Sequence, residues 1–193
     1  MIGPGRTPRL AAGAAVLTVG VLAAACAPSA PTEPPVVAGP LPASRMPQTG
    51  QPPGVPAGAQ RATVDRIVDG DTFWVRASGA GLLPVGRRVK VRLLEYDTPE
   101  RGQCWFAEAT ARLAQLTPVG SVVWLESDRE LLDRYGRSLR YVWTPRGVLV
   151  DAEMVRLGMG RALLVRPNAA RIDLIRAAER DAMRARRGLW AAC

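Results

Sequence analysis

Three short runs of apolar and β-branched residues follow one another near the middle of the chain, and turn residues separate them. The runs are residues 63–68, 72–77 and 87–94, with Asp69-Gly70 in the first gap and glycines and a proline in the second. Runs of this length with such turn residues between them are typical of antiparallel hairpins. The pattern therefore predicts a three-stranded meander.

The segments that follow predict helices and two further strands. The spacing predicts that residues 105–116 form a helix with its apolar side chains towards the core, and that residues 121–125 and 139–143 are strands. Asp151 is a suitable cap for a helix that ends at Leu157, and Pro167-Asn168 opens a last helix. The apolar positions of the two longer helices are Phe106, Ala109, Leu113 and Leu116, then Ile172, Ile175, Ala178, Ala182 and Ala185. Five antiparallel strands with a helix after the third predict an α+β fold, a five-stranded OB-fold barrel with three flanking helices.

Residues 1–26 have the composition of an export leader. Arg6 and Arg9 precede an uninterrupted small and apolar run, residues 10–25, and no acid occurs among them. A membrane span is the alternative, but 16 residues dominated by Ala and Gly are short for one. The segment Leu22-Ala23-Ala24-Ala25-Cys26 resembles a bacterial lipoprotein cleavage site, which predicts acylation of Cys26. Cleavage at an Ala-x-Ala site is the competing interpretation, since Ala23 stands where Leu is usual.

Residues 27–59 are rich in Pro, Ala and Gly and nearly free of charge, which predicts a disordered tether before a domain of residues 60–193. We therefore expect an exported protein, either anchored at the outer face of the cell membrane through Cys26 or released outside the cell. A monomer is the default expectation.

The chain carries 26 Lys and Arg against 17 Asp and Glu, a net charge of +9, which favours a polyanionic partner. Genomic bias towards Arg is the alternative, because Lys90 is the only lysine. The chain has no histidine, which excludes an imidazole base, an imidazole metal ligand and a Ser-His-Asp triad. A metal would be held mainly by oxygen, as Ca²⁺ or Mg²⁺ prefers.

Three carboxylates are candidates for metal and proton chemistry. Asp71 and Asp97 each stand at the margin of a predicted strand, where they could converge on one cation; ordinary turn chemistry is the alternative. Glu100 follows on the next loop, where it could orient or deprotonate an attacking water. Its alternative role is to compensate charge at the start of the next helix.

Two arginines are candidates for binding phosphate. Arg92 lies within an apolar strand, where an inward guanidinium needs an anion or, alternatively, a structural ion pair. Arg137 follows the turn residues Tyr135-Gly136, which could direct its side chain into a cleft. Planar guanidinium forks suit a phosphate that gains charge in a transition state. Together with the carboxylates, they predict metal-assisted phosphodiester cleavage.

The motifs and their order resemble the staphylococcal nuclease, or thermonuclease, family over about residues 61–190. The resemblance is carried by Asp69-Gly70-Asp71-Thr72, by Arg92 five residues before Asp97-Thr98-Pro99-Glu100, by Asp133-Arg134-Tyr135-Gly136-Arg137, and by Gly188-Leu189-Trp190. It implies an OB-fold enzyme that cleaves DNA and RNA with Ca²⁺ and leaves 3′-phosphate and 5′-hydroxyl ends. By this resemblance Asp71, Asp97 and the backbone carbonyl of Thr98 bind the cation, Glu100 acts on water, and Arg92 and Arg137 bind the scissile phosphate.

Departures from the family lie around the substrate. Arg134 stands where the family often has Lys, and Tyr135 matches an aromatic residue that flanks the nucleotide. Leu163 and Val165 replace two tyrosines of the well-known enzyme, so we expect a change in substrate affinity or base preference.

Cys104 and Cys193 are expected to form a disulfide in an exported protein, two free thiols being the alternative. Two other functions stay open at this point. One is a non-catalytic OB module that binds single strands or another anionic partner, and the other is a structural lipoprotein that meets anionic envelope polymers.

Overall fold

The structure, a computed structural model, describes residues 51–193. The predicted leader, Cys26 and residues 27–50 of the predicted tether lie outside the described residues. The strands of the described part are β1 Gln60–Ile67, β2 Thr72–Ala77, β3 Arg88–Leu93, β4 Tyr96–Asp97, β5 Val122–Glu126, β6 Ser138–Trp143 and β7 Arg161–Ala162. Its helices are α1 Phe106–Leu116, α2 Val150–Arg156, α3 Ile172–Arg184 and α4 Leu189–Ala192.

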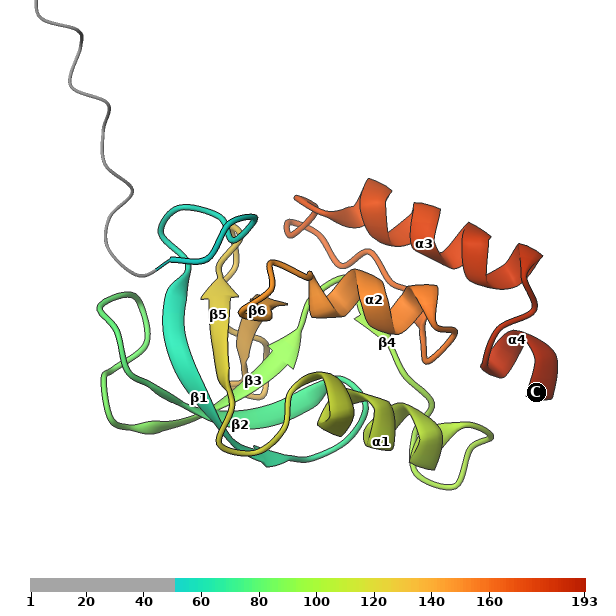
Figure 1. The fold of residues 1–193 in the computed structure, drawn as a ribbon, viewed down its shortest axis with the longest axis horizontal. Coiled ribbons are helices and arrows are strands. Elements are labelled where there is room, and N and C mark those ends of the chain that lie inside the picture. Colours follow the sequence, from blue (N-terminus) through green and yellow to red (C-terminus); the bar gives the residue numbers. More distant parts are fainter. Residues whose placement is uncertain (1–50) are drawn as a thin grey trace, which may run out of the picture. The chain divides into compact units, whose positions relative to one another are not determined.

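Five strands close into a barrel in the order β1-β2-β3-β6-β5, which confirms the predicted OB-type barrel (Figure 1). The meander of β1, β2 and β3 is antiparallel, as predicted. However, β3 pairs with β6 in parallel, so the prediction of five antiparallel strands is wrong at that pair. The reason is the odd strand number: directions can alternate all the way round a closed barrel only when the number of strands is even.

A second, two-stranded sheet and a fourth helix were not predicted. In this sheet β4 pairs with β7, so that Asp97 lies opposite Arg161. Each strand has two residues, too few to show an alternating pattern in the sequence. The pairing joins the loop that carries Asp97 to the segment after α2, which places this acid beside the helical part of the domain.

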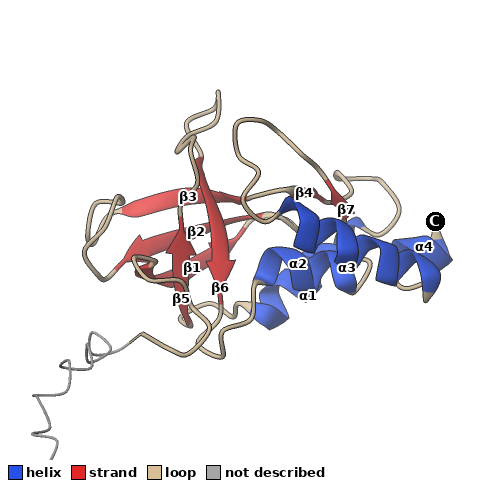
Figure 2. Cartoon of the chain, turned by 90° about the horizontal axis from the view of Figure 1, so that it is seen from above, coloured by secondary structure: helices blue, strands red, loops and turns tan. Residues whose placement is uncertain are grey.

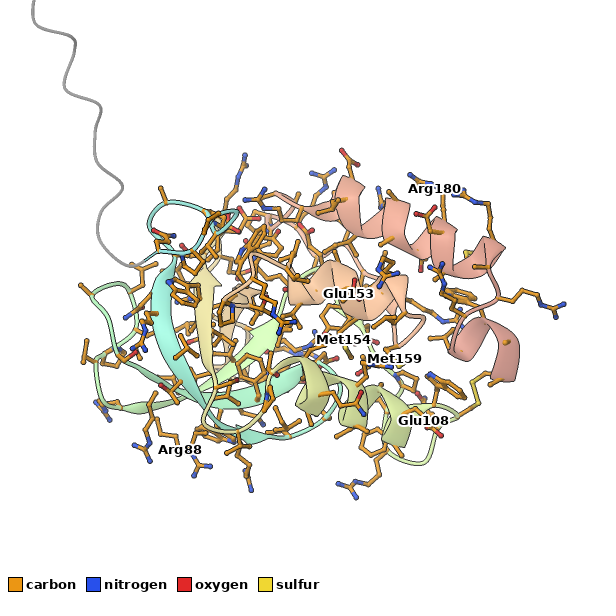
Figure 3. The ribbon with its side chains drawn as sticks, viewed as in Figure 1. Arg88, Glu108, Glu153, Met154, Met159 and Arg180 are labelled. Carbon is orange, nitrogen blue, oxygen red and sulfur yellow. A yellow bond between two sulfur atoms is a disulfide. The ribbon has the colours of Figure 1, made fainter. Side chains whose placement is uncertain are left out.

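The helices gather at one side of the barrel, with α2 between α1 and α3 (Figures 1 and 2). Helix α1 buries Ala109 and Leu113, as its apolar spacing predicted. Met154 of α2 is fully buried and lies between α2 and α1 (Figure 3). One continuous core therefore runs from the barrel interior into the helices.

Asp151 does not cap helix α2, as we had predicted. The helix begins at Val150 with Leu149 at its cap, two residues earlier than a cap at Asp151 would give, and the Asp151 side chain is fully buried. Its two carboxylate oxygens accept hydrogen bonds of 2.9 Å from the backbone N–H groups of Leu94 and Val142. The acid thus accepts from two buried backbone donors, of which the N–H of Leu94 also lies 3.2 Å from the carbonyl of Arg140, and it fastens α2 to the barrel.

The last helix begins at Ile172, five residues later than predicted from Pro167. Acids and backbone groups of the segment after β5 hold the intervening residues out of the helix. The Asn168 side chain bonds to the backbone of Glu130, and one oxygen of Asp128 accepts the N–H groups of Ala169 and Ala170. These bonds hold residues 168–170 against the segment after β5 in a local conformation that is not helical.

Residues 51–59 form turns that pack on the barrel, although they belong to the range 27–59 that we predicted to be a disordered tether. Val55 and Ala59 lie against a small apolar cluster built around Trp124 and Trp143. Among residues 51–193, no helix combines the length and the apolar character that crossing a bilayer requires.

Cys104 and Cys193 form a disulfide that joins the loop before α1 to the end of α4. Breaking it is expected to lower the free energy of unfolding by about 4 kcal/mol, because the bond closes a loop between residues 89 positions apart and so restricts the unfolded chain. Denaturant unfolding with and without reductant measures the change. Reductant should leave the double variant Cys104→Ser, Cys193→Ser unaffected, and equal midpoints for wild type and double variant would contradict the expectation.

Candidate active site

Asp71 lies in the turn between β1 and β2, and Gly70 makes that turn possible. A Cβ atom on Gly70 would come within 2.8 Å of the Thr98 hydroxyl and 2.9 Å of the Ala109 methyl. The Gly70 carbonyl also accepts a 2.9 Å hydrogen bond from the buried hydroxyl of Tyr96. The turn is therefore fixed tightly against β4 and α1, which holds the carboxylate of Asp71 in place.

The carboxylate of Asp71 is only 7% exposed as a residue and faces three polar partners. Its Oδ1 accepts a 2.8 Å bond from the Thr72 hydroxyl, and its Oδ2 accepts a 3.2 Å bond from the Thr98 hydroxyl. The same Oδ2 lies 3.1 Å from Nη2 of Arg92. Two segments distant in sequence are thereby brought to one carboxyl group.

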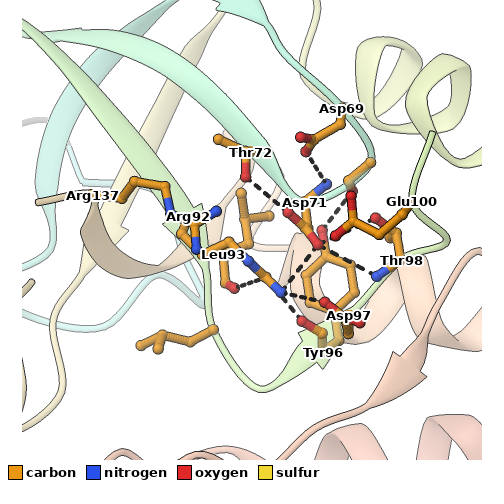
Figure 4. Close-up of polar contacts among 12 residues, drawn as sticks. Asp69, Asp71, Thr72, Arg92, Leu93, Tyr96, Asp97, Thr98, Glu100 and Arg137 are labelled. Carbon is orange, nitrogen blue, oxygen red and sulfur yellow. Dashed lines mark hydrogen bonds and ion pairs between the residues drawn. The ribbon is translucent and has the colours of Figure 1, made fainter. Parts of the chain in front are cut away.

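Arg92 projects from β3 between the two aspartates that we predicted as ligands (Figure 4). Its Nη2 is 2.8 Å from Oδ1 of Asp97, and its Nη1 donates to the carbonyls of Leu93 and Tyr96. The side chain is 11% exposed. The ion pair that we considered as the alternative to phosphate binding is thus present, and its acids are those of the candidate site.

Negative charge exceeds positive charge at this point. Asp69, which the sequence analysis did not single out, accepts a 3.2 Å bond from the backbone N–H of Asp71. Burial raises the pKa of Asp69, and the charge of Asp71 raises it further. Burial likewise raises the pKa of Asp97, while Arg92 lowers it and the charges of Asp71 and Glu100 raise it.

This donor set fits a hard cation. Asp71 and Asp97 share the guanidinium of Arg92, and the neighbouring charges of Asp69 and Glu100 add to the negative side. The side-chain donor atoms of these four acids are all oxygen, and an added positive charge would relieve their mutual repulsion. Within residues 51–193, no three acidic or thiol side chains are already arranged as a closed set of metal ligands. A cation here would therefore also use backbone carbonyls or water.

Glu100 is exposed in the loop between β4 and α1, and Figure 4 shows its carboxylate beside Asp71 and Thr98. The backbone N–H of Glu100 donates to the Gln103 side chain at 2.7 Å, and the N–H of Gln103 donates to the Glu100 carbonyl at 2.9 Å. Helix α1 starts only at Phe106, and the acid in its first turn is Glu108. Glu100 therefore does not compensate charge at the start of that helix.

Arg137 is positioned by a turn between β5 and β6. Oδ1 of Asp133 accepts the backbone N–H groups of Tyr135 and Arg137, and Gly136 has a φ of 74°, which favours glycine. Nε of Arg137 also bonds to Oδ2 of Asp133. Burial raises the pKa of Asp133, but these hydrogen bonds lower it more, so the net pKa is below its usual value. Asp133 is thus an ionised support for Arg137.

Arg92 and Arg137 line the same cleft, which has a volume of about 370 Å³. Tyr135 stands at it with 69% of its surface exposed, and Arg134 lies 4.8 Å from the centre of its ring. Val165 lines the cleft, whereas Leu163 does not, so only one of the two replaced tyrosine positions borders this cavity. The lining residues are Arg92, Leu93, Leu94, Glu95, Tyr96, Glu130, Asp133, Arg134, Tyr135, Arg137, Leu139, Val165 and Asn168.

The barrel and this site define an OB-fold protein in which Arg92 and Arg137 line one cleft and Arg92 also pairs with Asp71 and Asp97 beside it. The chain belongs to the staphylococcal nuclease family: the family model described as staphylococcal nuclease homologue matches residues 90–192.

Individual relatives match a larger part of the chain. It is 35% identical over 147 residues to a micrococcal nuclease of Shigella flexneri, covering 70% of this chain and 77% of the relative. A thermonuclease of Staphylococcus hyicus is 27% identical over 139 residues, covering 69% and 78%. Endonuclease YncB of Bacillus subtilis (strain 168) is 31% identical over 156 residues, covering 74% and 70%.

Proposed function

We propose that this protein is an exported, Ca²⁺-dependent nuclease that hydrolyses phosphodiester bonds of DNA and RNA and leaves 3′-phosphate and 5′-hydroxyl ends. Its family and its nuclease-named relatives support the hydrolase activity. The observation that carries the proposal for the site is that Arg92 lies between Asp71 and Asp97 and lines the same cleft as Arg137.

In this proposal Asp71, Asp97 and the backbone carbonyl of Thr98 hold Ca²⁺. When bound, the ion supplies positive charge that stabilises the phosphate as it gains negative charge. Arg92 and Arg137, which line the same cleft, donate hydrogen bonds to the non-bridging oxygens of the scissile phosphate.

Glu100 is an exposed acid of this group that has no ion pair with Arg92, and it accepts the proton of the attacking water or orients that water. Arg134 and Tyr135 bind the nucleotide next to the scissile bond, since the exposed ring offers a surface on which a base can stack. Val165 replaces a polar aromatic contact by an apolar one, so we expect weaker discrimination at the base it faces.

The leader and tether extend this proposal from the sequence alone. Residues 1–26 direct export, acylation of Cys26 anchors the protein at the outer face of the membrane, and residues from 27 onward separate the domain of residues 60–193 from the anchor. The protein acts as a monomer, and nucleic acid is its substrate.

Incubation with labelled single-stranded DNA, duplex DNA and RNA at millimolar Ca²⁺ tests the proposal against a non-catalytic OB module. We expect shortening of single strands and RNA, because every predicted acid and arginine of the site is present. Binding of all three nucleic acids without any shortening would overturn the proposal in favour of the module. A lack of both binding and cleavage would point to the structural lipoprotein.

A further inference from the structure

A second groove, of about 340 Å³, adjoins the cleft on the outer face of β2 and β3. Tyr135 and Arg137 line both hollows, so one leads into the other. No acidic side chain of the described residues lines the groove. Its cationic and aromatic lining consists of Trp74, Arg87, Arg88, Lys90, Tyr135 and Arg137. We call it the Trp74 groove.

The basic side chains on the outer face of β3 form a row that ends at the candidate active site. Neighbouring side chains on one face of a strand are about 7 Å apart, so Arg88, Lys90 and Arg92 follow one another along the outer face of β3. Across the pair, Trp74 lies opposite Lys90, and Thr72, which bonds to Asp71, lies opposite Arg92. A cationic track therefore leads from the groove to Arg92 in the candidate active site.

Trp74 and Arg88 form a flat, supported surface at the start of this track. The guanidinium carbon of Arg88 is 4.7 Å from the centre of the Trp74 ring, and Nε of Arg88 pairs with Asp65 at 2.6 Å. Figure 3 shows Arg88 at the barrel, on the side away from helix α3. Aromatic rings and guanidinium planes are the surfaces on which unpaired bases stack.

We propose that the Trp74 groove binds the continuation of a single-stranded nucleic acid beyond the nucleotide held in the cleft. An unpaired base stacks on the surface formed by Trp74 and Arg88, while Lys90 and Arg87 bind the phosphates on either side of it. This inference rests on the proposed function, because it assigns a further part of the same substrate. Charge complementarity and continuity with the cleft identify the occupant as a nucleic acid strand.

Binding of a labelled dinucleotide and of a strand of about ten nucleotides, both in chelator so that cleavage does not interfere, tests the proposal. We expect Trp74→Ala to weaken binding of the longer strand by on the order of tenfold to hundredfold and to leave the dinucleotide unchanged. Lys90→Gln should weaken the longer strand less and reduce the salt slope of its affinity by about 0.7. The control Arg180→Gln removes a charge from the exposed face of α3 and should change neither.

Lys90 allows a second measurement on the unaltered protein, because it is the only lysine. Reductive methylation of Lys90, followed by mass spectrometry of its peptide, should be blocked by the longer strand and not by the dinucleotide. This protection measurement also tests whether the longer strand occupies the Trp74 groove if the Trp74→Ala variant does not fold.

The two proposals fail in different ways. Length-dependent protection of Lys90 without strand cleavage would overturn the proposed function and leave the groove intact. Cleavage with equal methylation of Lys90 in the presence of either ligand would overturn the groove and leave the nuclease intact.

Discussion

Asp71→Asn is expected to lower the rate of phosphodiester cleavage by about a thousandfold or more, with the fold unchanged. The substitution keeps the shape of the side chain and an acceptor for the Thr72 or Thr98 hydroxyl, but it removes the charge that would hold a cation. It also leaves Arg92 with one charged partner, Asp97, in place of two. Single-turnover rates across a range of Ca²⁺ concentrations, together with circular dichroism, measure the two effects.

The matched control for this variant is Asp181→Asn on helix α3. Asp181 is likewise paired with an arginine, Arg184, but it lies on the exposed face of helix α3 and does not line the cleft. We expect wild-type rates for the control. Near-native turnover in Asp71→Asn, or an equal loss in Asp181→Asn, would contradict the assignment of Asp71 as a ligand.

Arg137→Ala is expected to lower kcat by about a hundredfold to a thousandfold and to change substrate affinity far less. The guanidinium contributes most when the phosphate carries extra charge, which happens only in the transition state. The turn should survive the substitution, because Asp133 still accepts the backbone N–H groups of Tyr135 and residue 137.

Separate measurement of kcat and of the dissociation constant distinguishes this role from simple binding. Arg137→Lys should recover only part of the loss, because an ammonium group cannot form two parallel hydrogen bonds to one phosphate. Arg146→Ala, at an exposed position in the turn after β6, is the control. Equal losses in affinity and in kcat for Arg137→Ala would show that Arg137 only binds the substrate.

Much of the barrel was predictable because its strands are local patterns. The three runs of the meander became β1, β2 and β3, and the turn at Asp69-Gly70 became the edge of the candidate site. The parallel pairing of β3 with β6 was not read from periodicity, since both strand directions give the same alternation of side chains. Only the closure of the barrel decides it.

Contacts between distant segments were beyond a local reading. The sequence suggested a cap at Asp151, but burial against Leu94 and Val142 gave this acid a different set of partners. Likewise, the ion pairs of Arg92 with both aspartates depend on a turn and a two-residue strand meeting at the barrel end. The site residues could be named from motif order, but their partners could not.

Some signals were present in the sequence and were not used. Asp69 belongs to the same short motif as Asp71 and contributes to its charge balance. The alternation of Arg88, Lys90 and Arg92 in β3, opposite Trp74, is visible as a period of two. This alternation forms part of a groove only because the fold places the turn that carries Tyr135 and Arg137 beside it.

The most direct test of the central claim is to determine the ends of the products that the wild-type protein makes from one end-labelled oligonucleotide, with Ca²⁺ and with a chelator. We expect cleavage only with Ca²⁺, and fragments that carry 3′-phosphate and 5′-hydroxyl ends. Cleavage that persists in chelator, or fragments with 5′-phosphate ends, would contradict the account of a cation site at Asp71 and Asp97 that serves this hydrolysis.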